Sequence, residues 1–140
     1  MDRLFLDANV LFSMAYGSPG IGRLWDLCRS GQCRLLASRY VVAEAQRNLD
    51  GAVQQARLAA ALSDVDLVAE APQDLACPVP QPPKDQPVLL AALAVRATHL
   101  VTGDLLHFGA WYGKSIRGTH VCTPAQYLAR ASSPPDPSPQ

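Results

Sequence analysis

A chain of 140 residues can build one domain, and at this length it buries enough apolar surface to fold without disulfides or a structural metal. Its 49% share of apolar residues excludes a disordered chain, and its net charge of zero excludes a strongly basic protein whose charge alone would indicate a nucleic-acid partner. No apolar run is long enough to span a membrane, and the N-terminus shows no secretion signal, so we expect a cytoplasmic protein.

The positive charges come mainly from arginine, which supplies ten of the twelve cationic residues; the two lysines are Lys84 and Lys114. Arginine can contact phosphate in a bidentate way, which suits a nucleic-acid ligand. A GC-rich genome would produce the same bias, so composition does not decide between these explanations.

The cysteines are too scattered to form a metal site with the three histidines. None of them belongs to a C-x-x-C pair. We therefore expect reduced, partly buried thiols at Cys28, Cys33, Cys77 and Cys122.

Short apolar strands alternate with helices along the first half of the chain. Gly31 is expected to end a helix, because glycine adopts the left-handed conformation that often follows the last helical turn. Ser38 is expected to begin the next helix as its N-cap, with Glu44 on or beside the apolar stripe of that helix. In chain order the predicted elements are a strand at 3–6, a helical turn at 10–16, a helix at 21–30, a strand at 33–37, helices at 38–49 and 51–62, and a strand at 65–69.

Five prolines between residues 72 and 83 predict a surface connection without regular structure. Asp85 then caps a helix that carries Pro87 in its first turn. The remaining predicted elements are a helix at 85–97, strands at 99–102 and 119–122, and a helix at 123–130. We assign residues 1–130 to one domain and expect a disordered tail at 131–140, where proline and serine leave little to bury.

Alternating strands and helices predict an α/β fold in which helices cover both faces of a parallel sheet. Ligands bind such sheets outside the carboxyl ends of the strands, where the strand order reverses. Asp7 directly follows the first predicted strand, and Asp104 follows the fourth after one glycine. Asp85 begins a helix that returns toward the same edge, and Glu44 lies one turn into a helix that leaves it. Each acid alone has an ordinary structural explanation as a turn residue, an N-cap or a surface residue.

Four carboxylates brought together repel one another unless protons or a divalent cation neutralise them. Mg²⁺ and Mn²⁺ prefer oxygen ligands, and such an ion can generate a nucleophile from water and stabilise charge on a phosphoryl oxygen. No serine–histidine or cysteine–histidine arrangement stands out as an alternative nucleophile. The four acids therefore favour metal-assisted phosphodiester chemistry.

The segments that carry these acids resemble those of PIN-domain nucleases, in the family's order, over residues 2 to about 130. The matching segments are Phe5–Leu11, Ser38–Leu49, Lys84–Leu93, Leu100–Asp104 followed by His107-Phe108, and Thr123–Leu128. The chain is most similar to the VapC-like group, the toxin components of bacterial toxin–antitoxin pairs.

This resemblance implies a PIN-like, three-layer α/β/α fold with a sheet of five parallel strands, and a Mg²⁺- or Mn²⁺-dependent endoribonuclease that hydrolyses RNA. The catalytic acids it implies are Asp7, Glu44, Asp85 and Asp104. Of these, Asp7, Asp85 and Asp104 would hold the metal. Asn9 and Thr102 match flanking positions that orient acids or water in the family.

The resemblance also implies partners: an RNA substrate, a small cognate antitoxin protein and a second copy of the chain in a homodimer. Relatives often carry another acidic residue shortly before the position of Asp85, where this chain has Pro82 and Pro83. The number of metal ions therefore stays open.

Three further residues after Asp104 are candidates for RNA contact. His107 would contact substrate or assist proton transfer, although packing or solvation explains it as well. Trp111 and Tyr112 lie in an aromatic segment that would stack a base, anchor the loop or contact another subunit.

Two other functions stay open at this point. One is a non-catalytic module of the same fold that binds RNA or a protein. The other is a doubly wound phosphoryl-transfer domain, which the sequence favours less: receiver domains carry a lysine where this chain has Thr123-Pro124, and the related phosphatases require aspartate where it has Asn9.

Overall fold

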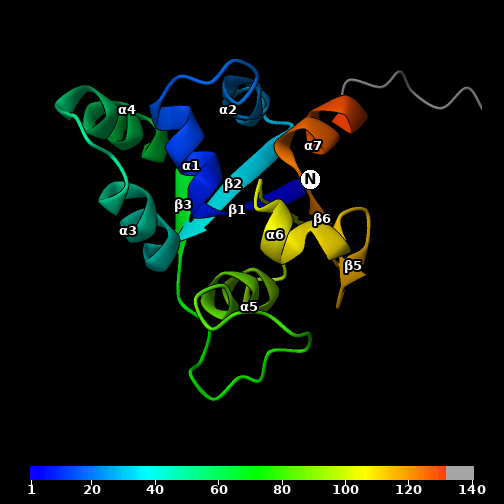
Figure 1. Ribbon diagram of the computed structural model, residues 1–140. Coiled ribbons are helices and arrows are strands. Elements are labelled where there is room, and N and C mark those ends of the chain that lie inside the picture. Colours follow the sequence, from blue (N-terminus) through cyan, green and yellow to red (C-terminus); the bar gives the residue numbers. More distant parts are fainter. Residues whose placement is uncertain (132–140) are drawn as a thin grey trace, which may run out of the picture.

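The sheet at the centre of the molecule has six strands in the order β3-β2-β1-β4-β6-β5. Figure 1 shows them in the computed structural model, which describes residues 1–131. Neighbouring strands run parallel except for β5 and β6, which form an antiparallel hairpin at one edge. The strands are β1 (Asp2–Leu6), β2 (Cys33–Ser38), β3 (Val65–Val68), β4 (His99–Val101), β5 (Ser115–Ile116) and β6 (Thr119–Cys122).

Seven α-helices flank this sheet within the described residues. They are α1 (Ala8–Ala15), α2 (Gly22–Arg29), α3 (Arg39–Arg47), α4 (Ala52–Leu62), α5 (Gln86–Ala94), α6 (Leu105–Phe108) and α7 (Pro124–Ala131), with a 3-10 turn at Gly109–Trp111. Helix α1 packs against α3 and α4, whereas α5 packs against β4. No helix in residues 1–131 is both long and apolar enough to cross a membrane. The predicted α/β fold with a largely parallel sheet is confirmed.

Local sequence signals set several of these boundaries as predicted. Ser38 is the N-cap of α3, and its hydroxyl accepts a hydrogen bond from the backbone N–H of Val41. Gly31 follows α2 with a φ of 80°, which glycine adopts without strain. The proline-rich connection contains no helix or strand between β3 and α5.

Several elements differ from the prediction. The sheet has a sixth strand, because Ser115–Ile116 pairs with β6, and residues 105–111 are helical where no element was expected. Helix α5 ends at Ala94 rather than residue 97, because Arg96 takes a positive φ of 54° and turns the chain toward β4. Ala131 closes α7 instead of beginning a tail. The disorder expected beyond it concerns residues 132–140, which lie outside the described residues, so that expectation and the domain boundary at 130 stay predictions.

The strand order brings two loops together at one edge of the sheet. Leu4, Phe5 and Leu6 are fully buried, so β1 runs through the core between β2 and β4. From β1 the chain moves outward to β2 and β3 and then returns to the other side of β1 to form β4. The order therefore reverses between β1 and β4, which is where sheets of this kind place their ligand sites.

Candidate active site

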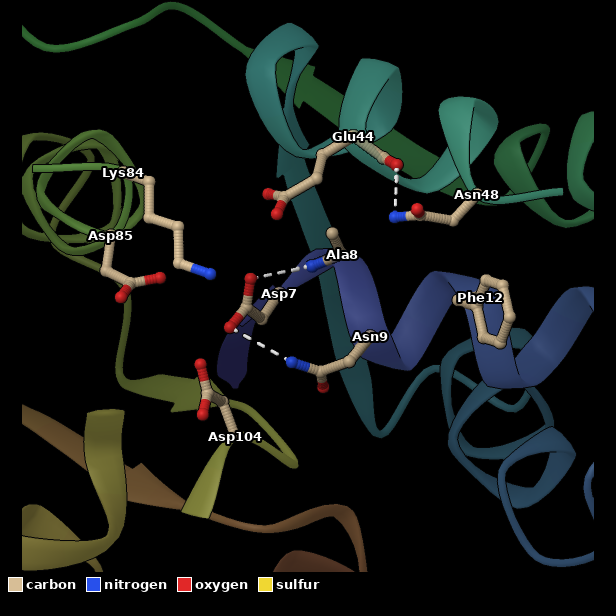
Figure 2. Close-up of a pocket in the computed structure, with 9 residues that line it drawn as sticks. All are labelled: Asp7, Ala8, Asn9, Phe12, Glu44, Asn48, Lys84, Asp85 and Asp104. Atoms are coloured by element: carbon tan, nitrogen blue, oxygen red, sulfur yellow. Dashed lines mark hydrogen bonds between the residues drawn. The ribbon is translucent and has the colours of Figure 1, made fainter. Parts of the chain in front are cut away.

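The four predicted acids line one pocket of about 370 Å³ beside the carboxyl ends of β1 and β4. Figure 2 shows Asp7, Glu44, Asp85 and Asp104 directed toward its interior from separate elements. Asp7 follows β1, and its backbone N–H donates to the carbonyl of Val101 at 3.0 Å, which extends the pairing of β1 with β4 beyond the strand. The fold thus assembles acids that lie up to 97 positions apart in the chain, from 7 to 104.

Three donors hold the carboxylate of Asp7, which is only 5% exposed. Its Oδ1 accepts from the backbone N–H of Ala8 at 2.7 Å, so Asp7 is the N-cap of α1. Its Oδ2 accepts from the hydroxyl of Thr102 at 2.8 Å and from the amide of Asn9 at 3.2 Å. Burial raises the pKa of Asp7, the hydrogen bonds from Thr102 and Ala8 lower it, and the charges of Glu44 and Asp104 raise it again.

Asn9 and Thr102 also tie the loop after β1 to the loop after β4. The Oδ1 atom of Asn9 accepts from the backbone N–H of Gly103 at 2.7 Å. The hydroxyl of Thr102 accepts from the backbone N–H of Asp104 at 3.1 Å. The two flanking residues that the sequence singled out therefore orient Asp7 and fix the backbone that carries Asp104.

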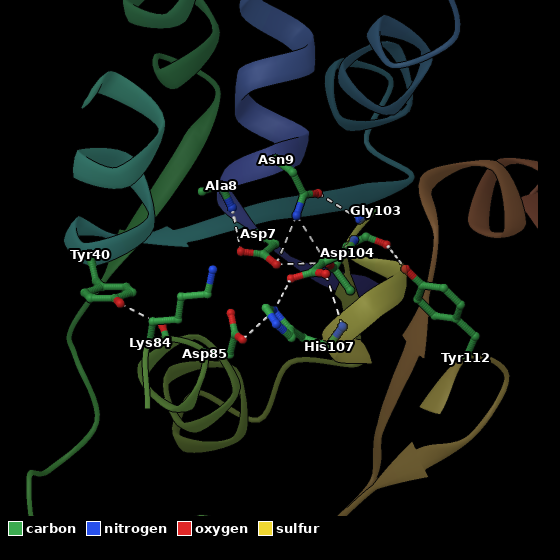
Figure 3. Close-up of polar contacts among 11 residues, drawn as sticks. Asp7, Ala8, Asn9, Tyr40, Lys84, Asp85, Gly103, Asp104, His107 and Tyr112 are labelled. Carbon is green, nitrogen blue, oxygen red and sulfur yellow. Dashed lines mark hydrogen bonds and ion pairs between the residues drawn. The ribbon is translucent and has the colours of Figure 1, made fainter. Parts of the chain in front are cut away.

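A histidine lies between the other two aspartates. His107 Nδ1 is 2.8 Å from Asp104 Oδ2 and also 2.8 Å from Asp85 Oδ2, as Figure 3 shows. The contact with Asp104 has hydrogen-bond geometry, whereas Asp85 Oδ2 is buried without a hydrogen-bond partner among the described residues. One nitrogen with one proton cannot donate to both carboxylates, so the Oδ2 atom of Asp85 would be stabilised by a further positive charge.

The N-cap explanation of Asp85 does not hold. Asp85 occupies the N-cap position of α5, but its backbone is helical and its side chain accepts no capping hydrogen bond. The side chain is buried and turned toward the pocket instead. Burial raises the pKa of Asp85, His107 lowers it, and the neighbouring charges of Asp104 and Asp7 raise it further.

Glu44 forms the opposite wall of the pocket. It lies in the middle of α3, partly exposed, between the buried residues Val41 and Ala45. Its charge raises the pKa of both Asp7 and Tyr40, which places it electrostatically within the cluster. The helix face predicted from the sequence is therefore the one that faces the pocket.

The residues present fit a divalent cation. Oxygen or nitrogen ligand atoms of Asp85, Asp104 and His107 lie within 4.8 Å of one another. The buried and unpartnered oxygen of Asp85 belongs to this group, as expected of an atom that a cation would satisfy. The predicted metal trio contained Asp7 in the place of His107; Asp7 adjoins the cluster, but capping of α1 engages one of its oxygens.

Trp111 and Tyr112 do not line the acidic pocket. Both pack against the hydrophobic core, and the hydroxyl of Tyr112 donates to the carbonyl of Thr102 at 3.0 Å. Tyr112 thus supports the loop after β4 from behind, and a contact of either ring with RNA stays a prediction.

Lys84 is a pocket residue to which the sequence assigned no role. It lines the pocket beside Asp85, and Figure 2 shows its ammonium group extending toward Asp7. The available signal was the rarity of lysine in the chain, together with the position of Lys84 directly before a candidate metal ligand.

Comparisons with solved structures agree with this fold. Two solved complexes of the VapBC toxin–antitoxin type contain a chain of similar fold. One is VapBC2 from Rickettsia felis bound to a DNA fragment from their promoter, with a TM-score of 0.62, 17% identity, and coverage of 86% of this chain and 98% of that chain. The other is DNA-bound VapBC from Salmonella typhimurium, with a TM-score of 0.59, 21% identity, and coverage of 89% and 99%.

No curated protein sequence gives a significant match. Residues 3–106 match the sequence model of the family described as PIN domain. The matched range includes all four acids, and of the fourth segment only His107-Phe108 lie beyond it. This chain therefore belongs to the PIN-domain family.

Proposed function

We propose that this protein is a divalent-metal-dependent endoribonuclease that hydrolyses phosphodiester bonds of RNA. The observation that carries the proposal is the convergence of Asp7, Glu44, Asp85 and Asp104 on one pocket at the reversal of strand order. Membership of the PIN-domain family supports it. The described residues that line this pocket carry no hydroxyl or thiol group, and water as the nucleophile agrees with this lining.

Asp85 and Asp104 would hold the ion together with Asp7, and His107 offers a further ligand atom. When bound, Mg²⁺ or Mn²⁺ supplies Lewis acidity, which makes water a stronger nucleophile at neutral pH and offsets charge on the phosphoryl oxygen. Thr102 and Asn9 orient the Asp7 carboxylate, so its geometry is set before substrate arrives. Glu44, which faces the pocket from α3, orients the attacking water by accepting a hydrogen bond.

The biological role we propose is that of the toxin in a toxin–antitoxin pair. It rests on the similarity in fold to VapBC complexes. In this role the protein acts on RNA in the cytoplasm as a homodimer and is held inactive by a small cognate antitoxin. Induction of the wild-type protein alone should arrest growth, and co-expression of the protein from the adjacent reading frame should relieve the arrest.

Cleavage of RNA in the presence of Mn²⁺ tests the catalytic proposal. Wild-type protein should cut single-stranded RNA, and Asp7→Asn should not, because the amide removes one of the negative charges that hold the ion. Asp26→Asn is the matched control, since the Asp26 side chain is 74% exposed on α2. Equal cleavage by wild type and Asp7→Asn would assign the activity to a contaminant. Calorimetry that shows no Mn²⁺ binding, together with no cleavage, would favour the non-catalytic module instead.

A further inference from the structure

The acidic pocket contains one positively charged side chain among its described lining residues, that of Lys84. Four carboxylates surround the same space. The ammonium group of Lys84 lies between Asp85 and Asp7 (Figure 2). The charge of Lys84 lowers the pKa of Asp85, although burial, which raises it, has the largest effect and that of Lys84 is smaller.

Lys84 does not form an ion pair with any of these acids. No ion pair with an N···O distance within 4.0 Å involves Lys84 in residues 1–131, although His107 makes two such contacts in the same pocket. The residue is exposed, so its three ammonium protons remain available to a ligand that enters from solvent. The ammonium group lies close enough to influence the acids and is still free to bind an anion.

The backbone of Lys84 is held in place by its neighbours. The hydroxyl of Tyr40 donates to the carbonyl of Lys84 at 2.7 Å, which joins α3 to the segment before α5 (Figure 3). On the other side, the backbone N–H of Asp85 donates to the carbonyl of Pro82 at 2.9 Å. Pro82 and Pro83 restrict φ just before the lysine. The root of the side chain is therefore fixed relative to Asp85, while its four methylene groups can adjust.

The charge balance gives this lysine a role in substrate binding. One divalent ion offsets two of the four carboxylate charges, and the pocket then remains negative and repels an anionic phosphodiester. We propose that Lys84 binds the phosphate group of the RNA at the acidic pocket, with its ammonium group donating hydrogen bonds to a non-bridging phosphate oxygen. This inference rests on the proposed ribonuclease function. No bond is made or broken at Lys84, which acts as a substrate-positioning residue.

The chain provides a matched control, because Lys84 and Lys114 are its only lysines. Lys114 is exposed and does not line the pocket. Binding of a fluorescent single-stranded RNA is measured by anisotropy with Ca²⁺ in place of Mn²⁺, at several salt concentrations. Lys84→Gln should weaken RNA binding roughly tenfold, because one charge-assisted hydrogen bond to phosphate is lost. It should also reduce the steepness of the plot of log K against log salt by about 0.7, the value for one phosphate contact on a single strand. Lys114→Gln should leave affinity and slope unchanged, and Lys84→Arg should restore most of both.

Metal affinity separates this role from a structural one. Removing a cation beside an acidic cluster should strengthen Mn²⁺ binding in Lys84→Gln, measured by calorimetry on the protein without RNA. RNA affinity and metal affinity therefore should change in opposite directions, whereas a damaged pocket would lose both. An unchanged RNA affinity and salt slope in Lys84→Gln overturns the proposal, and so does a variant in which Mn²⁺ and RNA binding fall together. RNA binding that depends on Lys84 without cleavage by the wild type would instead support this inference and reject the nuclease function.

Discussion

The hydroxyl of Thr102 connects the two halves of the candidate site. It is fully buried, donates to Asp7 Oδ2 at 2.8 Å and accepts from the backbone N–H of Asp104 at 3.1 Å. Removing this single oxygen takes away the acceptor of the Asp104 N–H and one of the two donors to Asp7 Oδ2. The threonine thus sets the position of one acid directly and that of the other through the backbone.

Thr102→Val should weaken Mn²⁺ binding at pH 6 more than at pH 8. The Thr102 hydrogen bond lowers the pKa of Asp7 against burial, so its loss raises the pKa of that carboxyl further. Protons then compete with the metal at a higher pH than in the wild type. The stability cost should be about 1–3 kcal/mol, because the backbone N–H of Asp104 loses its acceptor and Asp7 Oδ2 keeps only the donor from Asn9.

Mn²⁺ affinity as a function of pH, measured by calorimetry, checks this prediction. Thr102→Ser keeps the hydroxyl and should follow the wild-type profile, with a smaller loss of stability from the missing methyl group. A parallel loss of affinity at every pH in Thr102→Val would mean that the hydroxyl serves only the backbone around Asp104.

The turn of the β5–β6 hairpin holds an arginine in a backbone conformation that is unfavourable for it. Its two central residues are Arg117 and Gly118, with φ values of 48° and 89°. Turns of this kind require a positive φ at both positions, which asparagine and glycine adopt with little strain and arginine does not. The hairpin persists because Ile116 and Thr119 beside the turn are buried against the core.

Arg117→Asn should therefore stabilise the protein, by about 0.5–1 kcal/mol, since asparagine tolerates the left-handed conformation better. Gly118→Ala should lower the free energy of unfolding by a similar amount or more; a Cβ there would meet no atom within 4 Å, so backbone strain alone acts. Urea unfolding of both variants measures the pair of changes. A loss of stability in Arg117→Asn would show that contacts of the arginine side chain outweigh the strain.

The parts of the fold that could be predicted from the sequence are those with a local sequence signal, and the hairpin lacks one. Strands such as Leu4–Leu6 are apolar and bounded by a polar turn, and the helix cap at Ser38 depends on adjacent residues alone, so local patterns suffice for them. Strand β5 has only two residues and a turn without the Asn-Gly or Asp-Gly signal, so no local pattern marks it.

The candidate site could be predicted only in part for a similar reason. The positions of Asp7 and Asp104 follow from strand ends, which a parallel sheet brings to one edge. The sequence placed Asp85 among the candidate acids but left N-capping as an equally adequate explanation, and only the structure shows that its side chain makes no capping hydrogen bond. The contact of His107 with both Asp85 and Asp104 depends on α6, a four-residue helix that was not expected from the sequence and whose N-cap is Asp104.

At the scale of the whole molecule, the acidic pocket destabilises the metal-free fold. Burial raises the pKa of both Asp7 and Asp85 above the ordinary value for aspartate. The folded state therefore binds protons at these carboxyls more tightly than the unfolded chain does. Their contribution to stability is present below the pKa of an unfolded aspartate, about 3.9, and is lost as the pH rises through the higher pKa of the folded state.

Asp85→Asn should consequently melt at a higher temperature than the wild type at pH 7 in EDTA, because the amide is buried at a smaller cost than an ionised carboxylate. A gain of about 1 kcal/mol corresponds to roughly 3–5 °C in a domain of this size. The difference should shrink as the pH falls toward 4, where the wild-type carboxyl takes up its proton. Saturating Mn²⁺ should reverse the order, because the wild type gains binding free energy in the folded state that the variant lacks. Thermal unfolding at pH 7 and pH 4, with and without Mn²⁺, measures the difference in melting temperature under each of these four conditions. Asp26→Asn is the exposed control. A variant that is less stable than the wild type in EDTA at pH 7 would contradict this prediction. It would mean that the contact of Asp85 with His107 stabilises the fold by more than the burial of the carboxylate destabilises it.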